Sequence, residues 1–543
     1  MLKNAQRCLG ALGLVMCFPV AGLAGPDALT ADDARHLLAR TGFGAAPHEI
    51  NALIGTSAEA AVDNILEGLA IEPATPMPAW VDAWSYPFGQ IEALGATAEE
   101  LFYANRYLEV TELQQWWLGE MIATPSPMTE RLVLFWHGHF ATSIDGVEHP
   151  QWLAGQNRFF RAHAAGNFRD LAAGILRDPA MLVYLTNTEN LREAPNENLA
   201  REYLELFTLG EGRGYTEGDV TEAARALTGH TVDYIGGAGH VFDAEGHDFE
   251  PKTIFGATGA YDASDLPDLV LGHPAFGPYI VEALWREFVS DKPEDGEVTR
   301  LTEHWRRMDW ALRPLLREML LSDAFWAPEA RGRLVKSPID LLVGSVRSLG
   351  LAVSDLGDLA WASEELGQAP FLPPNVGGWP EGRDWLTDAT ASARATALIY
   401  MLQADRDVEL RRQPVSMMAA PAQQVVATAG RGDLRVGQVF VTEAFRLEEE
   451  DGIELMVTLF DVGFGGHDWR SISFWLGVWP GDTFFLALHR GDCAPDCFAD
   501  WPTNLDDVPA WIEFEPERGL RRDFRALSED DSRLLGAILA NLP

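Results

Sequence analysis

From residue 30 to about residue 412, apolar side chains recur every three or four positions, a spacing typical of amphipathic α-helices. The longest such stretch runs from Leu101 to Ile122, and its pattern predicts a buried side of Leu108, Leu113, Trp116, Trp117 and Met121. Thr216 precedes Asp219 by three residues, which predicts a capped helix ended by Gly229. Further helices are predicted over 32–38, 128–136, 266–271, 279–288, 298–305, 311–321, 339–349 and 389–404. We therefore expect a large, non-repeating helical domain over residues 25–412.

The pattern changes near the C-terminus. Residues 413–432 are rich in Ala, Gln and Gly and poor in aromatic residues, which predicts a linker. Beyond them, apolar and polar residues alternate between Val439 and Leu459 around an Asp451-Gly452 turn, and this alternation predicts β-strands. Two more strands are predicted over 471–476 and 483–488, and a closing helix over 528–542. The expected fold is mainly α, with a small C-terminal β-rich module over residues 433–543.

Residues 1–24 have the pattern of a secretory signal peptide. Basic residues precede an apolar run from Cys8 to Leu23, and we expect cleavage after Ala24. The run is short for a permanent membrane anchor, and lipidation at Cys17 is a further alternative. A periplasmic or secreted protein follows, without stable membrane insertion after cleavage.

The composition excludes several classes of protein. A net charge of −40 argues against nucleic-acid binding and against attachment by charge to an anionic bilayer. A hydrophobic fraction of 47% with 18 Trp excludes intrinsic disorder. Removal of the signal peptide leaves Cys493 and Cys497, which predict a disulfide in an exported chain, with a zinc site including His489 as the alternative.

His137-Gly138-His139 follows the predicted helix over 128–136. Imidazoles two residues apart share one side of an extended backbone, and Gly138 permits the change from helix to extended chain. Such a pair can present two ligands to a metal ion. The alternative is that each histidine packs among the neighbouring aromatic residues.

The segment from Asn196 to Gly210 is predicted to be a helix that carries several charges. Glu197, Arg201 and Glu205 lie four residues apart on one stripe, and Glu202 lies beside them. Carboxylates close to an apolar face require a metal, an arginine or a proton as partner when they are buried. The alternative is a structural ion-pair network.

Two loops carry further candidate chemistry. The segment from Gly246 to Thr253 places His247, Asp248 and Lys252 together, and His230 after Gly229 could join them; a solvated loop is the alternative. A second loop, 373–386, combines paired glycines with Trp379 and Trp385, which either stack on a sugar or fill the core.

These segments together resemble one bacterial family, known as domain of unknown function 1800. The resemblance rests on the stretches 34–44, 135–143, 196–210 and 215–229, on the loop with His247 and Lys252, on Lys336-Ser337-Pro338 and on Gly377-Gly378-Trp379-Pro380. It implies an exported, largely helical protein without an established activity, and it supplies no catalytic residues. The family often has Trp at the position of His230, whereas the β-rich segment is outside the resemblance.

Two functions follow from these residues. The first is a metal-dependent hydrolase of the cell envelope, in which a divalent ion (Zn, Fe or Mn) activates water. Its candidate metal ligands are His137, His139 and Glu202, and its candidate catalytic residues are Arg201, Glu202, Glu205, His247 and Asp248. The second is a non-catalytic envelope binding or assembly protein, with a structural ion-pair network and a polysaccharide or envelope protein as partner.

Overall fold

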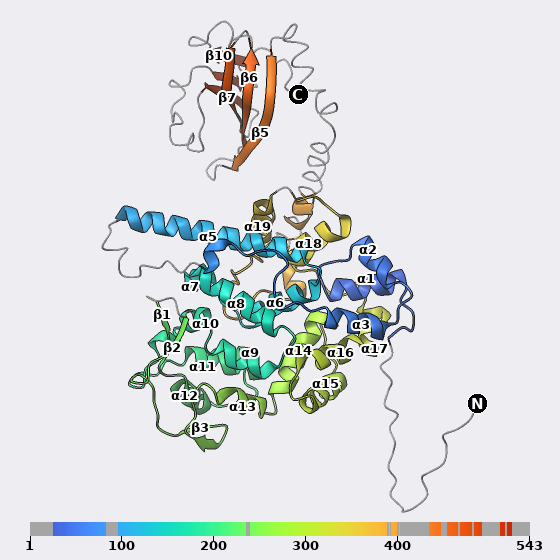
Figure 1. The fold of residues 1–543 in the computed structure, drawn as a ribbon, viewed down its shortest axis with the longest axis vertical. Helices are drawn as coiled ribbons and strands as arrows, with labels where there is room; N and C mark the ends of the chain where they lie inside the picture. The colour runs from blue at the N-terminus through green and yellow to red at the C-terminus, as the bar shows by residue number, and fades with distance from the viewer. Residues whose placement is uncertain are drawn as a thin grey trace, which may run out of the picture. The chain divides into compact units, whose positions relative to one another are not determined.

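The protein, in a computed structural model, forms two compact units, residues 1–405 and 406–543. The structure describes residues 25–82, 96–234, 239–353, 355–387, 390, 393–398 and 401 of the first unit, and six strands between residues 434 and 523 of the second. The described part of the first unit is mainly helical, as predicted (Figure 1). The predicted divisions at residues 24, 412 and 432 lie outside the described residues.

Three helices begin the described chain: α1 (Ala31–Arg40), α2 (Pro47–Leu53) and α3 (Ala58–Glu67), followed by the 3-10 turn η1 (Ala79–Asp82). The Thr30 hydroxyl accepts a hydrogen bond from the Asp33 amide, and the Asp33 carboxylate accepts one from the Thr30 amide. This reciprocal capping fixes the start of α1.

The next helices are α5 (Ala96–Ala123), α6 (Pro127–His139), α7 (Ile144–Val147) and α8 (Pro150–His163). The predicted buried side of α5 is confirmed for four positions, Leu113, Trp116, Trp117 and Met121. It is wrong for Leu108, which is 64% exposed. The reason is that the N-terminal part of α5 extends past the neighbouring helices, as Figure 1 shows.

The following segment is built from α9 (Phe168–Ile175), α10 (Pro179–Tyr184), the 3-10 turn η2 (Asn187–Glu189), α11 (Asn198–Glu202), the π-helix η3 (Tyr203–Leu209) and α12 (Glu217–Ala226). The predicted cap of α12 is confirmed, because the Thr216 hydroxyl accepts from the Asp219 amide at 3.3 Å. Gly229, with φ +76°, follows the end of α12, where a residue with a Cβ is disfavoured.

Two short antiparallel hairpins follow α12. The first pairs β1 (His230–Asp233) with β2 (Gly239–Phe242), and the second pairs β3 (Lys252–Ile254) with β4 (Ala257–Gly259). They lie at the same end of the unit as α12 (Figure 1). The segment between them is the loop with His247 and Lys252.

The rest of the unit comprises α13 (Leu266–Leu271), α14 (Phe276–Phe288), α15 (Asp295–Arg307), α16 (Leu312–Leu320), α17 (Asp323–Trp326), η4 (Pro328–Ala330), α18 (Pro338–Leu349), α19 (Leu356–Glu365) and η5 (Gly382–Trp385). The helix predicted over 266–271 coincides with α13. The helices predicted near α14, α15, α16 and α18 are confirmed with small shifts at their ends. The helix predicted over 389–404 lies partly outside the described residues.

One hydrophobic cluster extends from Leu29 to Trp385 and joins these helices into a single core. A fully buried ion pair crosses it, in which Arg161 on α8 contacts Glu130 on α6 at 2.8 Å. The indole of Trp117 on α5 donates to the same carboxylate at 2.9 Å. Because an unpaired charge is costly at such a depth, these bonds hold the three helices in one arrangement.

The second unit contains strands β5 (Leu434–Arg446), β6 (Ile453–Phe464), β7 (His467–Trp479), β8 (Thr483–Arg490), β9 (Trp511–Glu515) and β10 (Gly519–Asp523). They pair antiparallel in the order β10-β9-β8-β7-β6-β5. Four predicted features lie outside the described residues: the signal peptide, the linker over 413–432, the Cys493–Cys497 disulfide and the closing helix. Among the residues that are described, no helix is both long enough and apolar enough to span a bilayer.

Candidate functional site

The two histidines of His137-Gly138-His139 lie on a helix, so the extended arrangement predicted for them is wrong. Helix α6 continues to His139, and the Phe140 amide still donates to the Trp136 carbonyl at 2.8 Å. Residues two apart on a helix point in divergent directions. The imidazoles accordingly enter different surroundings.

The His137 ring lies inside an aromatic enclosure. Its centroid is 5.5 Å from Trp117, 5.4 Å from Phe371 and 5.4 Å from Trp379. Burial lowers the pKa of His137 to about 3, and a hydrogen bond with Gln156 opposes that shift only in part. His137 is therefore a neutral core residue at physiological pH.

His139 caps the end of the π-helix η3. Its Nε2 donates to the carbonyl of Phe207 at 2.9 Å, and the Tyr279 hydroxyl donates to the carbonyl of Leu206 at 2.7 Å. The last carbonyls of a helix have no partner within it, so these side chains satisfy two of them. Burial lowers the pKa of His139 to about 4, and its role here is that of a hydrogen-bond donor.

Arg201 is the centre of an ion-pair network on α11 and α12. Its guanidinium contacts Glu197 at 2.9 Å, Glu205 at 3.2 Å and Glu217 at 2.8 Å. These bonds hold α11 and the π-helix against the first turn of α12. Glu202 is half-buried beside the network, and burial followed by the charge of Glu205 raises its pKa.

The candidate metal ligands do not form a common site. His139 bonds a main-chain carbonyl, His137 lies among aromatic rings, and Glu202 is next to Glu205. In the described parts of the chain, no three His, Cys, Asp or Glu side chains are arranged to hold a metal ion. Among the described residues, His137, His139 and Glu202 therefore do not meet as a ligand set.

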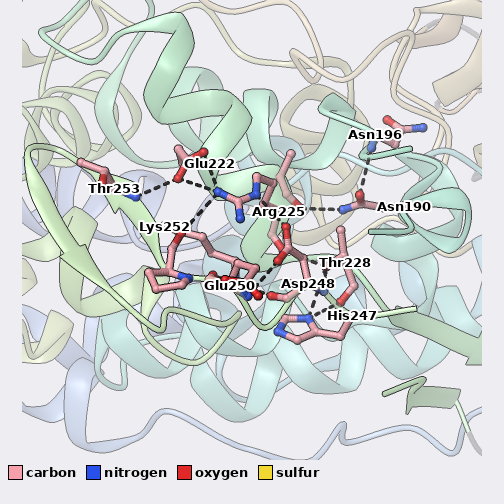
Figure 2. Close-up of polar contacts among 12 residues, drawn as sticks. Asn190, Asn196, Glu222, Arg225, Thr228, His247, Asp248, Glu250, Lys252 and Thr253 are labelled. Atoms are coloured by element: carbon pink, nitrogen blue, oxygen red, sulfur yellow. Dashed lines mark hydrogen bonds and ion pairs between the residues drawn. The ribbon is translucent and has the colours of Figure 1, made fainter. Parts of the chain in front are cut away.

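The loop with His247 is tied to the end of α12 (Figure 2). The Nδ1 of His247 donates to the Thr228 carbonyl at 2.7 Å, and the Asp248 amide donates to the Thr228 hydroxyl at 2.8 Å. The Asp248 carboxylate accepts from Arg225 at 2.7 Å. His247 and Asp248, two of the candidate catalytic residues, therefore bond different partners.

The Lys252 side chain lies inside the same loop and hydrogen-bonds to its backbone. Its buried ammonium donates to the carbonyls of Asp248 and of Glu250, the second at 3.1 Å. Burial lowers the pKa of Lys252, and the nearby charge of Asp248 opposes that shift. The loop backbone is held on both sides of Phe249.

His247 belongs to a cluster of three imidazoles. The ring of His230 is 6.4 Å from that of His247 and 5.1 Å from that of His240, and its Nδ1 lies 2.9 Å from Nε2 of His240. Burial is the main cause that lowers the pKa of His230, to about 4, and it also lowers that of His240. The lowered pKa values favour the neutral forms of His230 and His240.

His230 was expected to join His247, whereas sequence reasoning missed His240. Strand β1 pairs with β2 so that His230 is opposite Phe242 and Val232 is opposite His240. The two histidines are diagonal neighbours on one face of the hairpin, which is within reach of their side chains. The alternation His240-Val241-Phe242 is the one signal that could have indicated this face.

Two exposed phenylalanines contact His247. The ring centroids of Phe242 and Phe249 are 5.2 Å and 4.6 Å from the His247 ring. We call the surface formed by Phe242, His247 and Phe249 the His247 platform. His247 itself is 3% exposed, so the two phenylalanines supply the exposed part of this platform.

The loop over 373–386 belongs to the core. Trp379 and Trp385 are buried, so their alternative assignment as core residues is correct. Gly378 has φ +83°, and a Cβ at that position would lie 2.2 Å from the carbonyl oxygen of Gly138. The loop therefore packs backbone against backbone on the end of α6.

Fold and site together define an α-helical protein with exposed phenylalanines over a histidine cluster on a small hairpin and loop. Comparison with protein families gives a match to the family described as "Protein of unknown function (DUF1800)" over residues 36–449. The chain belongs to this family. Comparisons with curated proteins and with solved structures found no match.

Proposed function

We propose that the protein is a non-catalytic binding or assembly protein of the cell envelope. The observation that carries this proposal is the ion-pair network of Arg201, in which Glu197, Glu205 and Glu217 share one guanidinium. Carboxylates paired in this way stabilise the contact between helices and are not available as a base or as metal ligands. The neutral, enclosed state of His137 is consistent with the same role.

The proposed cellular location rests on the pattern of the N-terminal residues. The basic residues and the apolar run of residues 1–24 support export, with the mature chain in the periplasm or outside the cell. The proposal includes the C-terminal segment as a β-rich module that follows a linker. A Cys493–Cys497 disulfide closes a short loop within this module. Such a module, together with the helical domain, would contact a polysaccharide or another envelope protein.

The metal content of the purified mature protein separates this function from that of a metal-dependent hydrolase. We expect folded protein with far less than one metal ion per chain after purification without chelators. The matched variant is Glu202→Gln, which removes a carboxylate at a half-buried position and preserves side-chain volume. Stoichiometric zinc, iron or manganese that is lost in Glu202→Gln would overturn the proposal.

The variant Arg201→Ala tests the network itself. Arg201 is partly exposed, so we expect a loss of about 1 kcal/mol in the free energy of unfolding. Urea denaturation of wild type and variant measures it. Arg300→Ala, which removes another arginine that pairs with two glutamates, is the control for the general effect of losing a surface guanidinium. Unchanged stability in Arg201→Ala contradicts a structural role for the network.

A further inference from the structure

The His247 platform exposes two phenylalanine rings to solvent. Phe249 is 65% exposed and Phe242 is 47% exposed. They are the two most exposed phenylalanines among the side chains that the structure describes, and both contact the same imidazole. Leu191, also exposed, lies beside Gly246 and extends this apolar surface.

Hydrogen bonds and ion pairs hold the loop that carries His247, as Figure 2 shows. Arg225 binds Asp248 at 2.7 Å and Glu222 at 2.8 Å, and Glu222 in turn accepts from the Thr253 amide at 2.8 Å. The Asp248 carboxylate also accepts from the Glu250 amide at 2.9 Å. Bonds therefore fix the backbone on both sides of an exposed ring. A surface ordered in advance in this way loses little conformational entropy when a ligand binds.

Polar groups without net positive charge surround the rings. His247 is only 3% exposed, and its Nδ1 donates to the Thr228 carbonyl, so it supports the two exposed rings. Asp243 and Glu250 are exposed nearby and add carboxylate acceptors. Acceptors beside aromatic faces suit a ligand that has hydroxyl groups and apolar C–H faces.

The charge of the chain narrows the ligand class. A net charge of −40 repels polyanions such as acidic polysaccharides and nucleic acids. An uncharged sugar chain presents C–H faces for Phe242 and Phe249 and hydroxyls for the acceptors around them, without that repulsion. We propose that the His247 platform is a binding site for an uncharged glycan chain. The inference rests on the proposed binding function and names its ligand class and its site.

Binding of soluble oligosaccharides to the full mature chain tests this inference. The probes are hexamers of N-acetylglucosamine, of β-1,4-linked glucose and of α-1,4-linked glucose, with polygalacturonate as the anionic comparison. Isothermal titration calorimetry measures affinity. We expect saturable binding of at least one hexamer, little change between low and high salt, and no binding of polygalacturonate.

The variants Phe249→Ala and Phe242→Ala locate the site. We expect Phe249→Ala to weaken binding at least tenfold without a change in melting temperature, because the ring is largely exposed. Trp361→Ala is the matched control, since Trp361 is 57% exposed on α19, away from the platform segments, and its loss should leave affinity unchanged.

Three results would overturn the inference: no saturable binding of any hexamer, binding that Phe249→Ala leaves intact, or tighter binding of the polyanion. Capture of a protein partner by the platform in place of a glycan would overturn the ligand class as well. These results are distinct from failure of the proposed function, which appears as stoichiometric metal or as cleavage of the bound hexamer.

Discussion

At the scale of single residues, this protein keeps several titratable groups in the core in their uncharged form. Asp178 is one of them, because its burial raises the pKa of the carboxyl to about 7. Its Oδ1 accepts from Gln156 at 2.7 Å and from the Met181 amide at 2.9 Å, so the side chain also caps α10. The sequence indicates such a cap through Asp178-Pro179 but carries no sign that the carboxyl is desolvated.

The raised pKa of Asp178 predicts how stability depends on pH. A carboxyl whose pKa rises from 3.8 to about 7 on folding stabilises the fold below its unfolded pKa, and this contribution is lost as pH rises through 7. We therefore expect Asp178→Asn, which stays uncharged, to gain stability relative to wild type as pH rises toward 7, with no further gain above about pH 7. The gain is at most about 1.4 kcal/mol per pH unit.

Urea denaturation at pH 6 and pH 8.5 measures this difference. The quantity to compare is the stability of the variant minus that of the wild type at each pH, because the amide also alters the hydrogen bonds of residue 178 at both pH values. A stability difference that is the same at pH 6 and at pH 8.5 contradicts the assignment of a raised pKa.

At the scale of elements, the sequence predicts well what local patterns decide. The cap at Thr216, the glycine after α12 and the limits of α13 all depend on residues within a few positions of one another. The predicted end of α6 was wrong because a segment distant in sequence decides where this helix ends. Gly138 would ordinarily favour a break, but Gly378 and Trp379 pack against it and the helix continues to His139.

Substitution at Gly378 tests how much that contact stabilises the core. In Gly378→Ala the new Cβ would overlap the carbonyl of Gly138 in addition to the strain of a positive φ, so we expect a loss of at least about 3 kcal/mol. Gly382→Ala is the control, because Gly382 also has a positive φ but has open space around the added Cβ. It should lose only about 1 kcal/mol.

Chemical denaturation of both variants gives these values. Similar losses in Gly378→Ala and Gly382→Ala would show that the backbone contact between the two segments adds nothing to the strain of the positive φ.

The candidate site shows the same limit of sequence reasoning. His230 and His247 could be grouped because Gly229 and the following loop place them near one helix end. His240 could not be added to this group from the sequence, because the register of β1 against β2 decides that it lies beside His230. Glu197, Arg201 and Glu205 were correctly placed on one stripe, yet only the structure adds Glu217 from the next helix as the residue that completes the network.

At the scale of the whole molecule, buried histidines dominate the response to acid. Burial lowers the pKa of His137 and His149 to about 3 and that of His36, His139 and His230 to about 4, and it also lowers that of His240 and His304. A histidine with a lowered folded pKa contributes stability above its unfolded value of 6.5, and that stability is lost as pH falls below it. We therefore expect the free energy of unfolding to fall by several kcal/mol between pH 6.5 and pH 4.

Thermal and urea denaturation of the mature chain across this range provides the measurement. His139→Gln, which keeps a donor for the Phe207 carbonyl, should flatten the profile by removing one titrating group. A stability that stays constant down to pH 4 would contradict the neutral, buried state of these rings.

The contact between Gly138 and Gly378 has a consequence for how the chain matures. The two residues come together only when nearly all of the helical unit has been synthesised. A nascent or truncated polypeptide that stops before Gly377 lacks the Trp379 side of the enclosure around His137. Such a fragment would be prone to aggregation and a good substrate for quality-control proteases, so the unit completes its folding late and as a whole.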